Sequence, residues 1–389
     1  MTSEDRPMTV HLVAGEESGD ALGAALMRAL RDRVPGIRFG GLGGRAMAEQ
    51  GIASPFDIHE LSIIGFGAVL QQLPRILRRI RQTADAVIAA HPDALVIIDS
   101  PDFTHRVARR VRKAAPGIPI INYAPPSVWV WRPWRARAMR RYVDEVLAIL
   151  PFEPDAFARL SGPHCTYVGH PLAERLTELR PSAEEGRRRL ADPPLVLVLP
   201  GSRRSEVHRL AGTFGDALGQ VAARSGPLEL VLPTLPHIAG QVAEATAGWA
   251  VRPRIVTETH EKYAAFRAAR AALAASGTVT LELALAQVPM VAAYRLSQWE
   301  AVLLRRVANV DTVILPNLVL GEEAVPERVQ EICTADAIST ALLPLLSDTP
   351  ERRRQTEAFA RLDGIMGLAG DPPSRRAAEA VLGVIGRAG

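Results

Sequence analysis

A polar turn in the second half of the chain has the residue types of a phosphate site. Ser276, Gly277 and Thr278 follow an apolar run, and Glu282 lies about one turn into the helical pattern that comes next. Backbone N–H groups at a helix N-terminus carry partial positive charge and attract anions. A carboxylate one turn further on can accept hydrogen bonds from a ribose diol. The pattern therefore predicts a nucleotide diphosphate site.

A second apolar run in the same half ends in the segment 199–203 (LPGSR). The guanidinium of Arg203 can pair bidentately with a phosphate group. Taken alone, the segment favours a plain turn with a solvated arginine. Because it falls in the same predicted domain as the segment 276–282, we expect Arg203 to contact phosphate.

Two carboxylates follow a buried apolar run in the first half of the chain. Asp99 and Asp102 lie in the segment 98–103 (IDSPDF), and catalytic groups of α/β sheets reside at such strand ends. A carboxylate at this place can act as a general base. The alternative is that Asp102 or Ser100 caps the next helix. We expect Asp99 to be the base and one of the other residues to be the cap.

The segment 15–20 (GEESGD) lies between the first predicted strand and the first predicted helix. It lacks the three-glycine dinucleotide fingerprint, and its acidic residues would repel phosphate. We expect a loop whose Glu16 and Ser18 contact sugar hydroxyls. An equally good interpretation, compatible with the first, is a helix start with Asp20 at the N-cap.

Metal binding is not expected. His164, Cys165 and His170 fit no standard zinc spacing. The sequence has no Asp-x-Asp pair for a divalent ion, no Walker loop and no nucleophile elbow. We therefore expect neither a metal nor another cofactor.

Two segments are typical of a membrane surface. Segment 123–137 holds three of the five tryptophans and three arginines, and segment 66–81 interleaves apolar residues at helical spacing with four arginines. We expect a helix pair, broken at Pro74, that lies on an anionic bilayer; the alternative is an ordinary core-facing helix. The apolar stripe consists of Phe66, Val69, Leu70, Leu73, Ile76, Leu77 and Ile80.

The elements that must position these residues form two series. With 389 residues, 48% of them hydrophobic and 23% charged, the chain is a globular protein of two expected domains. Apolar runs alternate with amphipathic helical segments, which predicts doubly wound parallel sheets with a boundary near residues 170–190. We expect domains 1–175 and 176–350, followed by C-terminal helices 351–389 that pack back. Strands are expected at 9–14, 94–98, 118–123, 146–150, 195–199, 228–232, 271–275 and after Pro289.

The bulk composition limits the compartment and the partners. The formal net charge is +4, and arginine supplies nearly all the positive charge, since only Lys113 and Lys262 are lysines. Two cysteines offer no disulfide framework and are typical of a reducing cytosol. No apolar run of about 18 residues and no signal pattern occurs. We expect a cytoplasmic protein that is free or bound to a membrane surface.

Nine segments in order along the chain resemble one family, the lipid-A-disaccharide synthases of Gram-negative bacteria. Each segment is weak alone, whereas the ordered series is specific. The segments are 13–20 (VAGEESGD), 41–44 (GLGG) with Met47, 98–103 (IDSPDF), 126–132 (PSVWVWR), 150–153 (LPFE), 168–172 (VGHPL), 199–203 (LPGSR), 276–282 (SGTVTLE) and 315–318 (LPNL). The chain departs from the family pattern at Ala68, Thr104, Pro125 and Arg270.

The resemblance implies an inverting glycosyltransferase of the GT-B type, with two Rossmann-like domains facing across a cleft and no metal cofactor. The implied donor is UDP-2,3-diacylglucosamine, and the implied acceptor is 2,3-diacylglucosamine 1-phosphate. The products would be a β(1→6)-linked disaccharide 1-phosphate and UDP. The resemblance also implies peripheral association with the inner face of the inner membrane, and it favours a homodimer.

The matching positions carry the expected roles. Asp99 would be the base, Arg203 and the 276–278 turn would hold the diphosphate, and Glu282 would hold the ribose. Asn317 and Glu16 are further candidates for the diphosphate or the sugar. Contacts on the acceptor side are expected from Ser18, Asp102, Ser127, Trp129 and Arg132.

Two other functions compete with this interpretation. A UDP-N-acetylglucosamine 2-epimerase would share the two-domain layout and the nucleotide site. Its substrate has no acyl chains, however, so the apolar segment edged with arginines and the tryptophan cluster disfavour it. A basic nucleic-acid-binding protein is the second alternative, but the charge is spread along the chain and no RNA or DNA module occurs.

Overall fold

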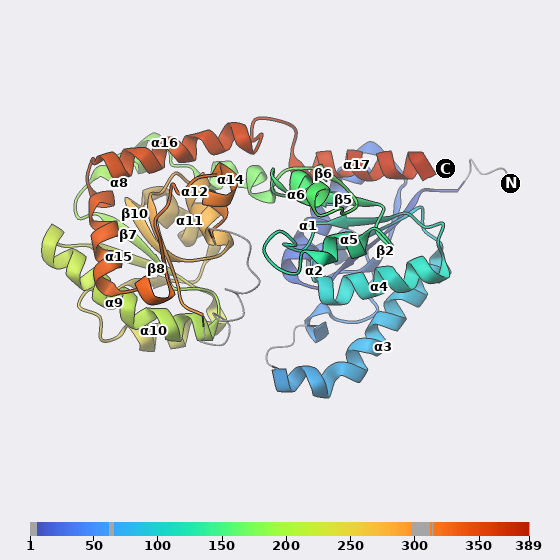
Figure 1. Cartoon of the computed structure of the whole chain (residues 1–389), viewed down its shortest axis with the longest axis horizontal. Coiled ribbons are helices and arrows are strands. Elements are labelled where there is room, and N and C mark those ends of the chain that lie inside the picture. Colours follow the sequence, from blue (N-terminus) through green and yellow to red (C-terminus); the bar gives the residue numbers. More distant parts are fainter. Residues whose placement is uncertain (1–5, 62–65, 297–311, 313, 389) are drawn as a thin grey trace. The chain divides into compact units, whose positions relative to one another are not determined.

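The computed structural model describes residues 6–388, except 62–65, 297–311 and 313. The chain forms two compact units: unit 1 comprises Met1–Ala173 with Gly370–Gly389, and unit 2 comprises Glu174–Ala369. The C-terminal helices, which we expected as one segment, are divided between the units. Helix α16 (Pro350–Ile365) belongs to unit 2, and α17 (Pro373–Ala388) belongs to unit 1 (Figure 1).

Unit 1 is built on a parallel sheet with the strand order β2-β1-β3-β4-β5-β6. Its strands are β1 (Thr9–Ala14), β2 (Arg38–Leu42), β3 (Ala94–Ile98), β4 (Ile120–Tyr123), β5 (Glu145–Ala148) and β6 (His164–Tyr167). The order reverses at the β1/β3 pair, because β2 lies on one side of β1 and all later strands lie on the other. Ligands of α/β sheets bind at such switch points, outside the carboxyl ends of the strands.

Different helices cover the two faces of this sheet. Leu95 and Ile97 of β3 pack in one apolar cluster with α3 (Phe66–Ala90) and α4 (Pro101–Ala114). Val96 and Ile98 pack in the other cluster with α1 (Glu17–Arg33) and α17. Burial on both faces explains why the inner strands read as continuous apolar runs.

Unit 2 is built on a second parallel sheet, with the order β12-β11-β10-β7-β8-β9. Counted from β7 as the first strand and read from β9, this is the Rossmann order 3-2-1-4-5-6, with its switch point at the β7/β10 pair. The strands are β7 (Leu195–Leu199), β8 (Glu229–Pro233), β9 (Arg254–Val256), β10 (Ala271–Ala275), β11 (Met290–Tyr294) and β12 (Glu327–Val329). Two doubly wound sheets confirm the predicted fold class.

The remaining helices connect these strands. In unit 1 they are α2 (Arg45–Glu49), η2 (Ile58–Leu61), α5 (Trp134–Met139) and α6 (Glu153–Arg159), and η3 (Pro171–Arg175) spans the division between the units. In unit 2 they are α7 (Leu176–Leu179), α8 (Ala183–Leu190), α9 (Arg204–Ser225), η4 (Pro236–Ile238), α10 (Ala239–Thr246), α11 (Thr259–Ala268), α12 (Thr278–Leu285), α14 (Leu315–Leu320), η5 (Gln330–Ile332), α15 (Ala335–Leu342) and η6 (Leu343–Leu346).

The predicted helix break at Pro74 was wrong, because α3 runs from Phe66 to Ala90 with this proline inside it. A proline within a helix removes one backbone hydrogen bond and bends the helix without having to end it. Figure 1 shows α3 changing direction along its length. The side chains of residues 66–72, which include three members of the predicted apolar stripe (Phe66, Val69 and Leu70), lie outside the described part of the structure.

The predicted N-cap role of Asp20 was also wrong. Helix α1 begins at Glu17 with Glu16 at the N-cap position, so Asp20 lies within the helix. Its buried carboxylate accepts backbone N–H bonds of 2.7–3.0 Å from Gly44, Ala46 and Met47. Asp20 therefore anchors the start of α2 against α1.

Candidate functional site

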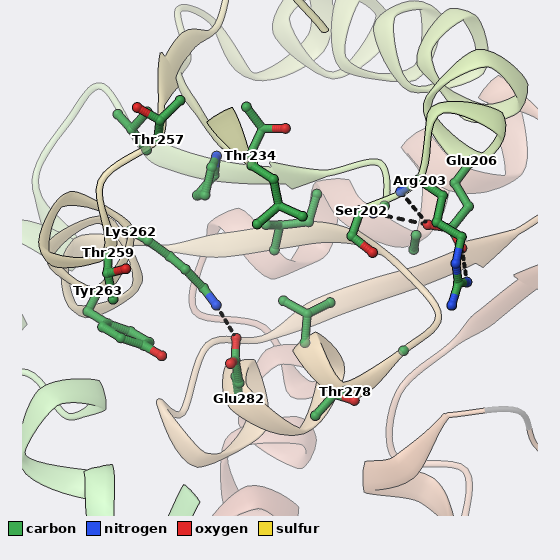
Figure 2. A pocket seen from close by; sticks show the side chains of 18 of the residues that line it. Ser202, Arg203, Glu206, Thr234, Thr257, Thr259, Lys262, Tyr263, Thr278 and Glu282 are labelled. Atoms are coloured by element: carbon green, nitrogen blue, oxygen red, sulfur yellow. Dashed lines mark hydrogen bonds and ion pairs between the residues drawn. The ribbon is translucent and has the colours of Figure 1, made fainter. Parts of the chain in front are cut away.

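A cavity of about 570 Å³ opens at the switch point of unit 2 (Figure 2). Its wall contains the last residue of four neighbouring strands, namely Leu199, Pro233, Val256 and Ala275. The cavity thus lies at the carboxyl edge of the sheet, where ligands of this fold bind. Five of the six residues predicted to contact the UDP-sugar line it: Arg203, Ser276, Gly277, Thr278 and Glu282.

The turn between β10 and α12 brings a helix N-terminus to this cavity. No side chain of the described residues caps α12, and its first turn has no acidic residue. A Cβ atom on Gly277 would meet no atom within 4 Å, so the space in front of the helix start is open. The partial positive charge of this end is therefore directed at the cavity and suits an anion.

Arg203 lies across the cavity at the N-cap position of α9, and its side chain is 75% exposed. Its Nη1 donates to Oε1 of Glu206 at 2.8 Å. The buried carboxylate of Glu206 also accepts the backbone N–H groups of Ser202 and Arg203 at 3.0 and 3.2 Å. Because these N–H groups are already paired, a phosphate on this side would be held by the guanidinium and not by the loop backbone.

Glu282 points into the cavity from α12 and forms an ion pair with Lys262 of α11 (Figure 2). Lys262 Nζ lies 2.6 Å from Oε2 of Glu282. Tyr263 lies beside this pair, and burial together with the charge of Glu282 raises the pKa of its hydroxyl. The guanidinium of Arg175 packs over the Tyr263 ring at 4.7 Å. This end of the cavity therefore combines one carboxylate with two cations and a neutral phenol.

Asn317 lies outside the cavity, contrary to expectation. Its side chain is buried, and its Nδ2 donates to the Val325 carbonyl at 2.9 Å and to Oε1 of Glu327 at 3.1 Å. Its Oδ1 accepts the N–H groups of Ala324 and Val325 at 3.0 and 2.9 Å. Every hydrogen-bonding position of the amide is thus used to hold the loop between α14 and β12.

At the switch point of unit 1, the loops after β1 and β3 meet. The hydroxyl of Ser18 donates to Oδ2 of Asp99 at 2.9 Å, and that of Ser100 donates to Oε1 of Glu16 at 3.2 Å. The structure therefore brings together Asp99, Glu16 and Ser18, which the sequence placed in two distant segments. The carboxylates of Asp99 and Glu16 make this edge of the sheet acidic, which suits a base or a ligand for hydroxyl groups.

The turn that carries Asp99 is held in a strained conformation. Asp99 and Ser100 have φ angles of 51° and 45°, a region that costs a non-glycine residue about 1–3 kcal/mol. The buried Thr104 hydroxyl donates to the Asp99 carbonyl at 2.7 Å. A Cβ atom on Gly15 would lie 2.6 Å from Oγ of Ser100, so glycine is needed where the two loops meet. The surrounding contacts thus hold the Asp99 turn in one geometry.

Asp102 points away from this cluster. Its side chain is 82% exposed and pairs with Arg135 at 2.9 Å. Helix α4 begins at Pro101, and Ser100 at the N-cap position forms no side-chain cap. The expectation that Asp102 or Ser100 caps α4 was therefore wrong. The reason is that Ser100 has a left-handed backbone and its hydroxyl is directed to Glu16.

Trp129 lies in the loop after β4, the strand next to β3. Its Nε1 donates to Oε1 of Glu153 at 3.3 Å, and its ring meets that of Phe152 edge-on at 4.9 Å. The buried Glu153 carboxylate also accepts the N–H groups of Ile149 and Leu150 at 3.1 and 2.9 Å. Burial raises the pKa of Glu153 to about 7. This carboxyl group therefore ties the loops after β4 and β5 together.

The other two acceptor-side candidates in this loop make local contacts. Ser127 is exposed, and its carbonyl accepts the backbone N–H groups of Val130 and Trp131 at 3.0 Å. The guanidinium of Arg132 lies 5.3 Å from the ring centre of Trp131. Neither contact reaches Asp99, so these residues share only the carboxyl edge of the sheet with it.

The described part of α3 carries an exposed apolar and basic surface. Leu73 and Leu77 are each 38% exposed, and Arg75 and Arg78 beside them are exposed as well. Ile80, one turn further on, is buried and belongs to the core. Among the helices of the described residues, none is both long and apolar enough to cross a membrane.

The sequence did not predict several residues that line the cavity, among them Arg175, Glu206, Lys262 and Tyr263. They come from α9, α11 and the connection between the units, none of which has a motif of its own. One signal was available for Lys262, which is one of only two lysines in the chain. In the part of the chain that the structure describes, no group of three His, Cys, Asp or Glu side chains is placed to hold a metal ion.

Comparison with known proteins gives a consistent result. A model of the family described as lipid-A-disaccharide synthetase matches residues 10–365. The lipid-A-disaccharide synthase of Rhodopseudomonas palustris (strain HaA2) is 60% identical over 375 residues, which cover 96% of this chain and 95% of that protein.

Solved structures show the same fold at much lower identity. A UDP-GlcNAc 2-epimerase from Neisseria meningitidis, bound to UDP-GlcNAc, has a TM-score of 0.64 at 15% identity and covers 97% of this chain and 100% of its own. A UDP-glucosyltransferase from Polygonum tinctorium has a TM-score of 0.61 at 15% identity, with 99% and 100% covered. These structures establish the fold, whereas the family match and the 60% identity establish descent. The chain therefore belongs to the lipid-A-disaccharide synthase family of glycosyltransferases.

Proposed function

We propose that the unit 2 cavity binds the UDP group of UDP-2,3-diacylglucosamine and that Asp99 is the base that activates 2,3-diacylglucosamine 1-phosphate. One observation carries this assignment: the cavity at the β7/β10 switch point combines a helix N-terminus without a side-chain cap, an exposed arginine and a carboxylate. The first two suit a diphosphate, and the third suits a ribose diol.

The proposed reaction is a single displacement with inversion. The 6-hydroxyl oxygen of the acceptor attacks C1 of the donor sugar while its proton passes to the carboxylate of Asp99. The bond between C1 and the β-phosphate oxygen breaks, and UDP leaves with the electron pair. Arg203 and the N–H groups at the start of α12 stabilise the charge that grows on the diphosphate. Full activity is therefore expected in excess EDTA, and a loss that magnesium restores would contradict this mechanism.

The surroundings of Asp99 support its role as the base. Its Oδ2 accepts a hydrogen bond from Ser18, and among the described residues it forms no ion pair with an arginine or lysine. Asp102, by contrast, is paired with Arg135. Of the two carboxylates, Asp99 is therefore the one that no described cation holds.

Two measurements on the purified chain test the proposal. Mass spectrometry should detect the tetraacyl disaccharide 1-phosphate when both acylated substrates are supplied, and calorimetry should detect UDP binding. If the chain epimerised UDP-N-acetylglucosamine and formed no disaccharide, the epimerase alternative would replace this proposal.

Membrane-surface association is a further part of the proposal. It is supported by Leu73, Leu77 and the neighbouring arginines, an arrangement typical of helices that lie on anionic bilayers. Binding to anionic vesicles should weaken with added salt. Leu73→Glu combined with Leu77→Glu should abolish it, and unchanged vesicle binding would contradict this part. The homodimer stays a prediction, which light scattering of the purified chain would test.

A further inference from the structure

Lys262 is unusual in this chain for its residue type alone. Of the 46 basic Lys and Arg residues, only Lys113 and Lys262 are lysines. Lys113 is exposed on α4, whereas Lys262 lies on the wall of the unit 2 cavity. In a composition that favours arginine so strongly, a lysine at a ligand site indicates that a guanidinium does not fit the task.

The contacts of Lys262 fix its ammonium group in one place. Nζ donates to Oε2 of Glu282 at 2.6 Å and lies 5.1 and 5.3 Å from the ring centres of Tyr263 and Phe266. The side chain of Lys262 is 28% exposed and that of Glu282 is 14% exposed, so the pair is largely shielded from water. Cation–π attraction to two rings adds to the ion pair and holds the ammonium against one side of the carboxylate.

The single contact matters because Glu282 has two acceptor oxygens. Oε2 is occupied by Lys262, while no hydrogen bond of the described residues involves Oε1. An arginine at this position would present a planar fork that matches both carboxylate oxygens at once. It would therefore mask the group that a ligand needs, whereas an ammonium is a compact point charge that can take one oxygen and leave the other.

We infer that Lys262 is a positioning residue for the nucleotide ribose, which holds Glu282 by one oxygen and leaves the other free to accept a ribose hydroxyl. This inference rests on the proposed UDP site. It adds that the preference of the cavity for a ribose over a dideoxyribose depends on the side chain at position 262 binding only one oxygen of Glu282. Lys262 also has two further N–H groups, which can donate to the oxygen of a ribose hydroxyl.

Calorimetry with UDP and 2′,3′-dideoxy-UDP tests the inference on the full chain. The wild type should bind UDP about ten- to a hundredfold more tightly, since a hydrogen bond to a charged group is lost with the dideoxy nucleotide. Lys262→Arg should lower UDP affinity about tenfold and leave dideoxy-UDP affinity within about twofold, so that the preference collapses. Lys262→Met masks neither oxygen but no longer holds Glu282 in place, so its preference should lie between those of the wild type and Lys262→Arg. In turnover assays both variants should raise KM for the donor and leave kcat near the wild-type value.

Lys113→Arg is the matched control and should change neither affinity. Thermal melting establishes that each variant is folded. If Lys262→Arg did not fold, Lys262→Met would carry the test: its preference for UDP should be weaker than that of the wild type, and an unchanged preference would overturn the inference. If Lys262→Arg kept the wild-type preference, or weakened both nucleotides equally, Lys262 would act elsewhere and the inference would be overturned. A stronger preference for UDP over dideoxy-UDP in Lys262→Arg than in Lys262→Met would overturn it too, because a positive charge of either shape would then suffice. If the wild type bound no UDP, the proposed function itself would fail.

Discussion

The two units share a parallel six-stranded sheet, yet the four helices that start at their switch points differ in chemistry. In unit 1, α1 carries Glu17 and Asp20 in its first turn, and α4 carries Asp102. In unit 2, α9 carries Glu206 in its first turn, and the carboxylate of Glu206 accepts the N–H groups of Ser202 and Arg203. Helix α12 alone among the four has no acidic residue in its first turn and no side-chain cap.

This difference divides the chemistry between the units. An acidic helix start repels a phosphate and accepts hydrogen bonds from hydroxyl groups, whereas a bare helix start attracts a phosphate. In the proposed function, the α12 turn therefore binds the diphosphate, and the loops that meet at Asp99 provide the base. The same fold thus supports opposite tasks through a few residues after equivalent strands.

Asp99→Asn should have the largest effect on turnover. The amide keeps the size of the side chain but cannot take up a proton, and general-base help is worth about a hundred- to ten-thousandfold. Steady-state assays should show a loss of this order, while UDP affinity in calorimetry stays at the wild-type value because the proposed UDP site is in unit 2.

Asp102→Asn is the matched control in the same motif. Its exposed pair with Arg135 contributes at most about 1 kcal/mol, and it caps no helix. Turnover and thermal stability should stay close to wild type. If Asp102→Asn abolished turnover on a stable fold and Asp99→Asn did not, Asp102 would be the base and the assignment to Asp99 would be wrong.

Glu153→Gln should change how stability depends on pH. Burial raises the pKa of Glu153 from 4.5 to about 7, so the folded state favours the protonated form. The contribution of this group is therefore fully present below pH 4.5 and is lost as the pH rises through about 7. The variant mimics the neutral acid, so its free energy of unfolding relative to wild type should rise by up to about 3 kcal/mol from pH 4.5 to pH 8. Urea unfolding at both pH values measures this, and a constant difference would contradict it.

Glu282→Ala addresses the unit 2 side of the comparison. Loss of the charged acceptor should weaken UDP binding by about 1–3 kcal/mol in calorimetry. Glu261→Ala on the same helix as Lys262 is the control, because Glu261 lies outside the cavity and, among the described residues, pairs with Arg254 alone, at 3.7 Å. Equal UDP affinity in the wild type and Glu282→Ala would show that the ribose binds elsewhere.

The strands that the sequence predicted are the inner ones of both sheets. The four that it missed, β2, β6, β9 and β12, are the four edge strands. An inner strand such as β3 is buried along its whole length and reads as an apolar run. An edge strand such as β6 (HCTY) is half-buried and polar, so its place depends on the neighbour that pairs with it.

The residues of the unit 2 cavity were likewise predictable only where they follow a buried strand. The cavity residues that follow predicted strands were found, because the position of a turn after a buried strand is a local property of the sequence. Lys262 and Arg175 were missed because they reach the cavity from other segments through tertiary packing. Asn317 was misplaced because its motif shows only that an amide is present, and the structure uses that amide to hold a loop.

The smallest predicted effect concerns Thr104, one of the positions at which the chain departs from the family pattern. Its buried hydroxyl donates to the carbonyls of Asp99 and Ser100 at 2.7 and 3.1 Å, so it supports the strained turn that carries Asp99, the proposed base. Thr104→Val keeps the volume and should cost about 1 kcal/mol of stability in urea unfolding. If the lost bond also loosens Asp99, turnover should fall about fivefold, since 1 kcal/mol on the barrier corresponds to that factor.

Thr83→Val is the matched control, because the buried Thr83 hydroxyl donates at 2.9 Å to the Arg79 carbonyl within α3. It should lose similar stability and keep full turnover. Equal turnover in both variants would mean that Thr104 stabilises the fold without positioning the base.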